Sequence, residues 1–319
     1  MNNTWYDRFL LILHKKYGKK SQLVEELMDL LYIEREAVYR RLRNEVVFSA
    51  LEVGKIAEKW DISLDDIMEI NPKEVLFKSK LFDYTDTSLD NLRSVMTTSE
   101  MLRCVKQHSD SEYVAVSNKL PHMLTAGFMN LYKFCLLKQA YQYANENINI
   151  FWDNLLKEDT AKSSLEFYDT LKNISNTHFV WDSMIFDYIV RDVQYFHSIY
   201  LLNNEQKGLI KKDLYGMLNY MLEVSSRGYW PETGNEVTIY ISHISIDTNY
   251  HYFSHFGEVK LCCVDTFGKN EIYTRNNIMA ENFKDWLHTM KKLSVRISQI
   301  DEKSRIKFFT KQQQIIDSL

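Results

Sequence analysis

Residues 27–43 read LMDLLYIEREAVYRRLR, and residues 49–57 read SALEVGKIA. In both stretches apolar residues recur every three or four positions, which is the spacing of the buried face of an amphipathic helix. The first stretch is interrupted at Tyr32, so its apolar residues belong to two helices joined by a tight turn. The pattern predicts a helix that ends near Tyr32, a second short helix from about Glu34 to Arg43, and a third helix over the second stretch.

Helix start and stop signals extend this pattern along the chain. Ser49 and Glu52 have the spacing of a capping box, in which each side chain accepts a hydrogen bond from a backbone N–H. Ser63 repeats the start signal for one more helix, and Pro72 ends it because the residue before a proline avoids helical angles. With two amphipathic helices upstream, these signals predict five short helices between residues 5 and 70.

The second short helix has one inward and one outward face. Val38 and Leu42, four positions apart, are expected to turn toward the preceding helix. The outward face is expected to carry Arg35, Glu36, Tyr39, Arg40 and Arg43. In a DNA major groove, Arg35 suits a bidentate pair with guanine, and Glu36 suits the amino group of cytosine. For Tyr39, an exposed aromatic packed on its neighbours is an equal alternative.

Several cations near this helix suit contacts with DNA phosphates, which position a protein without reading sequence. They are expected to be Arg40, Arg41, Arg43, Lys15, Lys16, Lys19 and Lys20. Such a charge run on its own is more often a solvated helix face. The capped helices that follow in the right order favour DNA contact instead.

The order of these segments resembles the lambda-repressor-like, or Xre-type, helix-turn-helix domain. The resemblance rests on residues 27–33, 35–43 and 49–57 and on the segment Ile62-Ser-Leu-Asp65, and it covers about a fifth of the chain. It implies a scaffold helix, a recognition helix and a packing helix, with DNA-binding regulation as the function. The run VYRRLR and the long chain after it also resemble, more loosely, a group of such regulators common in Bacteroidota.

The turn departs from the pattern of this family. The family usually has a small residue and a glycine where this chain has Met28 and Tyr32. Tyr32 is therefore expected either in the left-handed region, which favours glycine, or in a longer turn. The recognition helix also begins at Glu34 rather than at a serine or threonine cap, which places an anion near the expected phosphates.

The fold class expected from these patterns is mainly α. An N-terminal all-α helix-turn-helix domain over 1–70 precedes a linker over 71–86 and a C-terminal α+β domain over 87–319. The elements expected in the second domain are helices over 88–108 and on to about 226, a small antiparallel sheet over about 236–275, and closing helices over 279–299 and 301–317. The helix over 88–108 suits either the core of the domain or pairing with a second chain.

Composition narrows the class of protein. The 319 residues are 45% hydrophobic and 26% charged with a net charge of −4, so any nucleic-acid surface is local. No stretch reaches the roughly 18–20 apolar residues of a membrane span. We expect no signal peptide, and four cysteines without a CxxC spacing favour a reducing cytoplasm.

Catalytic and metal-binding motifs are absent from the sequence, so we expect no enzyme and no cofactor. His251 and His255 are four apart, but on a strand they lie about 13 Å from each other, too far to share a zinc ion. Adjacent Cys262 and Cys263 are expected on opposite faces of a sheet. Asp265 and Glu258 are scattered carboxylates that cannot be paired from sequence.

These observations predict a cytoplasmic, sequence-specific regulator that binds double-stranded DNA as a homodimer and responds to an effector of unknown identity. One alternative is a small-molecule sensor or enzyme-like domain with the helix-turn-helix as an adaptor, which a polar, ligand-shaped pocket would favour. Another is a protein-interaction scaffold, which an exposed apolar groove without DNA affinity would favour.

Overall fold

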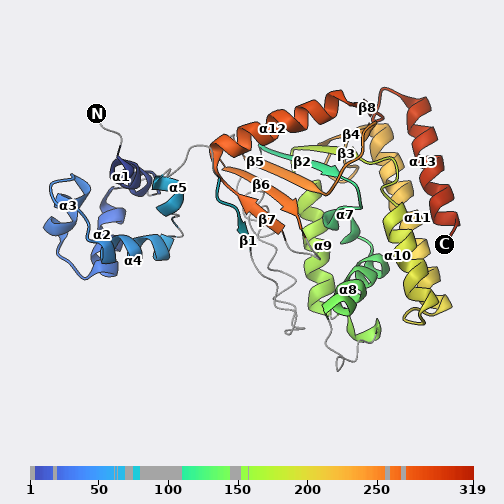
Figure 1. The fold of residues 1–319 in the computed structure, drawn as a ribbon, viewed down its shortest axis with the longest axis horizontal. Helices are drawn as coiled ribbons and strands as arrows, with labels where there is room; N and C mark the ends of the chain where they lie inside the picture. Colours follow the sequence, from blue (N-terminus) through green and yellow to red (C-terminus); the bar gives the residue numbers. More distant parts are fainter. Residues whose placement is uncertain are drawn as a thin grey trace. The chain divides into compact units, whose positions relative to one another are not determined.

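The computed structural model describes most of the chain, namely residues 4–16, 20–60, 62, 64–68, 75–79, 110–143, 152–156, 158–255, 259–266 and 271–319. The chain divides into two compact units, residues 1–76 and 77–319. Their elements are labelled in Figure 1. The helix expected over 88–108 lies outside the described residues, as do Lys19 and Ser63.

The first unit is a small all-α bundle, as the helix signals predict. Its described helices are α1 (Trp5–Lys16), α2 (Lys20–Leu31), α3 (Arg35–Leu42), α4 (Ala50–Trp60) and α5 (Leu64–Met68). They share one apolar core, in which Phe9, Leu27 and Val38 have no exposed surface. The capping box at the start of α4 is confirmed, because the N–H of Ser49 donates to Glu52 at 2.7 Å and the N–H of Glu52 donates to the Ser49 hydroxyl at 3.3 Å.

The second unit is built on one mixed sheet. Its strands are β1 (Lys78–Ser79), β2 (Ser111–Ser117), β3 (Asn176–Trp181), β4 (Glu236–Ser242), β5 (Tyr250–His255), β6 (Val259–Asp265), β7 (Glu271–Thr274) and β8 (Ser294–Arg296). Within the described residues the sheet has eight strands in the order β1-β7-β6-β5-β2-β3-β4-β8. The central strands β2, β3 and β4 are parallel, and the other pairings are antiparallel.

This sheet overturns the expected fold class, a mainly α chain whose second domain carries only a small antiparallel sheet. Strands do occupy the predicted region, but β4 pairs with β3 and β8 instead of β5. β2 and β3 fall in the part of the chain expected to be helical. Both are largely buried, and a parallel strand covered on both faces lacks the polar alternation that marks a half-exposed strand.

Helices cover both faces of the sheet (Figure 1). They are α7 (His122–Thr125), α8 (Met129–Tyr143), α9 (Glu158–Lys172), α10 (Asp187–Ser198), α11 (Asn204–Arg227), α12 (Asn277–Lys292) and α13 (Glu302–Asp317). Helices α7 to α11 and α13 pack with one face in a large core, and α12 packs with the other face in a smaller core. Cys263 lies in the first core and Cys262 in the second, so the prediction of opposite faces is confirmed.

The end of the chain also differs from expectation. The helix predicted over 279–299 ends at Lys292, and β8 follows it. A strand of three residues between two helices gives too short a pattern to recognise by period. Helix α13 has the predicted position, and Phe308, Phe309 and Ile316 bury their side chains in the core of their own unit.

Candidate nucleic-acid interface

Helices α2 and α3 are joined by three residues in a tight turn. Tyr32 adopts the left-handed conformation with φ +56°, and its N–H donates to the carbonyl of Met28 at 2.9 Å. Of the two conformations expected for Tyr32, the left-handed one is therefore present. Glu34 is the N-cap residue of α3 and makes no side-chain capping bond. The backbone N–H groups of the first turn of α3 thus lack a capping side chain.

The inward face of α3 is the predicted one. Val38 and Leu42 are buried in the same core as Val24 and Leu27 of α2. Residues three or four apart lie on one side of a helix, so burial of this pair turns Arg40 and Arg43 away from the core. Arg35 lies three positions before Val38, on the side of the buried pair, and is exposed as the first residue of α3. These three side chains are each about half exposed.

Carboxylates lie beside each of these outward arginines. Arg35 is 3.6 Å from Glu25, and Arg40 is 3.9 Å from Glu45. Arg43 is 3.0 Å from Glu36 and 2.7 Å from Glu45. Ion pairs this exposed are weak, so an incoming phosphate can displace them. The predicted base-reading residue Glu36 therefore pairs with Arg43 in the unbound protein.

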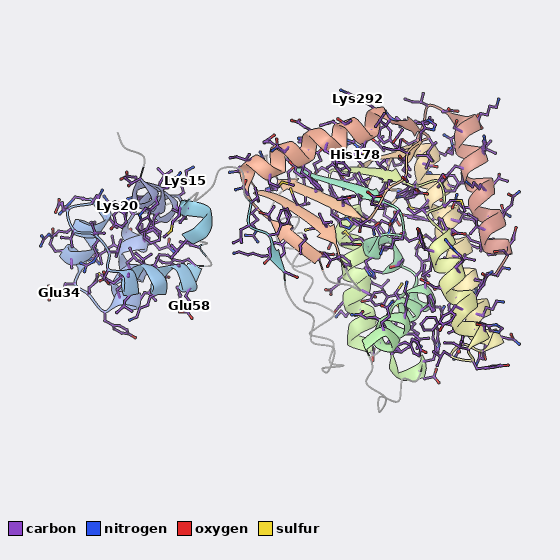
Figure 2. All side chains as sticks on the ribbon, viewed as in Figure 1. Lys15, Lys20, Glu34, Glu58, His178 and Lys292 are labelled. Atoms are coloured by element: carbon purple, nitrogen blue, oxygen red, sulfur yellow. The ribbon has the colours of Figure 1, made fainter. Side chains whose placement is uncertain are left out.

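The remaining predicted contacts have different surroundings. Tyr39 is half-buried against the core of the unit, and the ammonium of Lys20 lies 5.8 Å from its ring centre. Lys15 and Lys20 are exposed, and both are labelled with Glu34 in Figure 2. The packed alternative for Tyr39 thus matches its position, although its partial exposure leaves an edge of the ring accessible.

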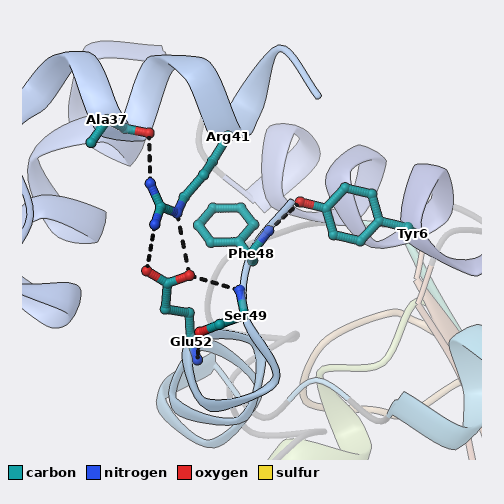
Figure 3. A network of polar contacts seen from close by, with 6 residues as sticks. All are labelled: Tyr6, Ala37, Arg41, Phe48, Ser49 and Glu52. Carbon is teal, nitrogen blue, oxygen red and sulfur yellow. Dashed lines mark hydrogen bonds and ion pairs between the residues drawn. The ribbon is translucent and has the colours of Figure 1, made fainter. Parts of the chain in front are cut away.

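Arg41 is held inside the unit. Its guanidinium donates to both carboxylate oxygens of Glu52, at 3.2 and 2.9 Å, and to the carbonyl of Ala37 at 3.2 Å (Figure 3). It also lies 5.9 Å from the ring centre of Phe48. Both side chains of the ion pair are less than one fifth exposed. Arg41 is therefore not available for the expected phosphate contact, because its ion pair with Glu52 joins α3 to the capping box of α4.

The charge of the first unit is balanced rather than basic. Residues 1–76 contain 12 lysines or arginines and 14 aspartates or glutamates. A DNA-binding surface on this unit must therefore depend on where the charges lie. Positive groups on the outer face of α3 and on Lys15 and Lys20 are the local source of attraction for phosphate.

In the second unit, His251 lies beside Asp265, a contact that could not be predicted from the sequence. Nε2 of His251 lies 3.3 Å from Oδ1 of Asp265, and its Nδ1 lies 2.9 Å from the hydroxyl of Tyr113. The amide of Asn249 donates to Oδ2 of Asp265 at 2.9 Å. These residues come together because β2 pairs with β5 and β5 pairs with β6. Tyr113, His251 and Asp265 are well separated in the sequence, so no short motif indicates their contact. No metal-binding cluster of His, Cys, Asp or Glu occurs among the residues that the structure describes.

Comparison with known proteins finds no matching family model, no matching curated protein and no matching solved structure. In the described part of the chain, every helix is too short or too polar to pass through a membrane.

Proposed function

We propose that this protein is a transcriptional regulator that binds duplex DNA, with α3 as its major-groove recognition helix. One observation carries the proposal. A short helix follows a three-residue turn, buries Val38 and Leu42, and leaves Arg35, Arg40 and Arg43 half exposed. This is the arrangement in which a helix-turn-helix unit presents one helix to the groove.

The residues of α3 have separate roles in this proposal. Arg35 and Glu36, in its first turn, read base edges, since the N-terminal residues of a recognition helix contact the bases. Arg40, Arg43 and Lys20 contact phosphates. Lys19 is also assigned a phosphate contact, because it precedes Lys20 in the sequence. Tyr39 packs beside them, and only the exposed edge of its ring is available for a contact with DNA. Arg41 belongs to the fold of the unit.

Affinity measurements on the arginines test this assignment. On a duplex that the protein selects, Arg35→Ala should weaken binding by about 1–3 kcal/mol and relax the base preference at one position. Arg40→Ala should weaken binding to all duplexes alike and reduce the salt dependence. Lys59→Ala removes an exposed cation from α4 and serves as the matched control. Unchanged affinity of both arginine variants at fixed salt would show that this face does not bind DNA.

We further propose that the protein acts in the cytoplasm as a homodimer without catalytic activity, and that the second unit responds to an effector. The dimer is supported by the need of a helix-turn-helix unit for two half-sites, about one helical turn apart. It draws no support from Phe308, Phe309 and Ile316 of α13, which are buried in the core of one chain. Light scattering of the purified chain tests it, and a monomer at working concentration would remove it.

A further inference from the structure

His178 is a polar residue in the otherwise largely apolar interface between the sheet and α12. It lies in β3 between Val114 of β2 and Thr238 of β4. On this face of the sheet, Val114 and Val180 pack in the same core as α12. The imidazole is mostly buried, and within the described ranges its Nδ1 atom has no hydrogen-bond partner. A buried nitrogen without a partner is unfavourable, so this position needs an explanation.

Charged groups from three elements face this imidazole. They are Glu112 of β2, Arg296 of β8, and His288 and Lys291 of α12, and Lys284 of α12 joins them through its ion pair with Glu112. On α12 the three residues stand at positions i, i+4 and i+7, which is one side of a helix. Glu112 is the carboxylate of this set, and it contacts two of the other groups. One oxygen lies 3.8 Å from Nε2 of His178, and the other lies 3.3 Å from the ammonium of Lys284.

The cluster therefore has more positive groups than its carboxylate can neutralise. Burial, followed by the charge of Lys291, lowers the pKa of His178 to about 4, against the opposing charge of Glu112. Burial also lowers the pKa of the Lys291 ammonium, although Glu112 opposes this shift. Arg296 donates to Ser298 at 3.3 Å and to Gln299 at 2.9 Å. Because these bonds occupy two of its N–H groups, its main contribution to the cluster is positive charge.

We propose that this cluster is a binding site for a small phosphate-bearing anion, between α12 and the amino ends of β2 and β3. Lys291 supplies positive charge and donors, the ring of His288 supplies a further N–H donor, and Nδ1 of His178 supplies a donor once the imidazole takes up a proton. A phosphate dianion fits better than a carboxylate because its oxygens can accept from several donors at once. The site goes beyond the proposed function and stands whether or not the first unit binds DNA.

Titration calorimetry on the full chain, at constant ionic strength, tests the site. Inorganic phosphate and a mononucleotide monophosphate, which separate free phosphate from a phosphate ester, are the probes, and acetate is the carboxylate probe. Phosphate or the ester should bind, and Lys291→Ala should weaken binding by about tenfold or more. Lys292→Ala removes the same charge from the adjacent, exposed position of α12 and should change affinity by less than about twofold (Figure 2). Lys291→Arg, which keeps the charge, should retain binding.

Three results would overturn the proposal: no binding of either phosphate or the ester by the wild type, equal losses in Lys291→Ala and Lys292→Ala, or acetate bound as tightly as the phosphate probes. A second readout follows the imidazole itself by NMR. A bound phosphate anion favours the imidazolium form, so phosphate should raise the pKa of His178 from about 4. An unchanged titration of His178 at saturating phosphate would equally contradict the site, whatever the affinity measurements show.

Discussion

Arg41 and Arg40 are neighbours of identical chemistry with different roles. Arg41 makes two charge-assisted hydrogen bonds to Glu52 in a mostly buried position, whereas Arg40 is exposed and 3.9 Å from Glu45. Arg41→Ala should therefore destabilise the first unit by about 1–3 kcal/mol, and Arg40→Ala by less than about 0.5 kcal/mol. Hydrogen exchange of α4 amides in the full chain measures both. Equal effects of the two substitutions would contradict the structural role of Arg41.

Tyr32 is the residue at which the turn between α2 and α3 is strained. A non-glycine residue in the left-handed region costs roughly 1–2 kcal/mol, and this side chain is 87% exposed and has little packing to lose. Tyr32→Gly should therefore raise the stability of the unit by up to about 1 kcal/mol, after the added chain entropy is subtracted. Gln22→Gly, at an exposed position within α2, should instead cost about 1 kcal/mol. Loss of stability in Tyr32→Gly would show that the tyrosine is held by contacts that outweigh the strain.

A carboxylate beside α3 competes with phosphate for the arginines of this helix. Glu45 follows the helix and pairs with both Arg40 and Arg43. If α3 lies in a DNA groove, Glu45→Gln should raise the affinity for any duplex by about two- to tenfold, because a repulsive charge disappears and two arginines are released. Stability should change by less than about 1 kcal/mol, since these pairs are exposed. Fluorescence anisotropy on selected and random duplexes measures the change. An unaltered affinity would place Glu45 away from the phosphates.

The pairing of β5 with β6 couples the stability of the second unit to pH. Burial opposes the charge of His251, but the hydrogen bond and charge of Asp265 outweigh it and raise the pKa of His251 above 6.5. Burial likewise opposes the charge of Asp265, but the hydrogen bond and charge of His251 keep the pKa of Asp265 below 3.8. The His251 contribution is complete below pH 6.5 and is lost as pH rises through its folded pKa. The Asp265 contribution is complete above pH 3.8 and is lost as pH falls through its folded pKa.

Urea unfolding at a series of pH values tests this coupling. The stability difference between the wild type and Asp265→Asn should be largest between about pH 4 and pH 6.5 and should shrink on either side. Asp247→Asn, which changes a carboxylate outside this hydrogen-bonded pair, is the control. A difference that does not vary with pH would show that the pair is not ionised in the folded protein.

Local signals predicted the helices of the first unit, whereas the sheet of the second unit required tertiary information. The capping box at Ser49 acts within four residues, so it can be read directly from the sequence. In contrast, β2 and β3 become strands because helices cover both of their faces, and burial of that kind leaves no alternating pattern. The strands over 236–275 were recognisable by their period, and their short connections predicted the antiparallel pairs β5–β6 and β6–β7. The partners of β4, which are β3 and β8, could not be predicted in this way.

The same distinction applies to the candidate sites. Helical spacing placed Arg40 and Arg43 outward, and both are about half exposed in the structure. Arg35 is also half exposed, but it lies on the side of Val38 and owes its exposure to its position at the start of α3. Helical spacing could not separate Arg41 from these arginines, because its partner Glu52 belongs to the next helix. His178 gave no signal in the sequence, since its surroundings come from β2, β8 and α12. Contacts between distant segments decide which polar residues are structural and which are available.

Considered as a whole, the chain joins an all-α unit with an outward cationic helix to a larger unit built on a mixed sheet. We propose that the first unit reads DNA sequence. Selection of duplexes from a random pool by the purified full chain tests this proposal most directly. We predict an enriched site with two related half-sites about one helical turn apart, and loss of preference at one base position of each half-site in Arg35→Ala. A pool that stays random after repeated selection at moderate salt would contradict sequence-specific DNA binding.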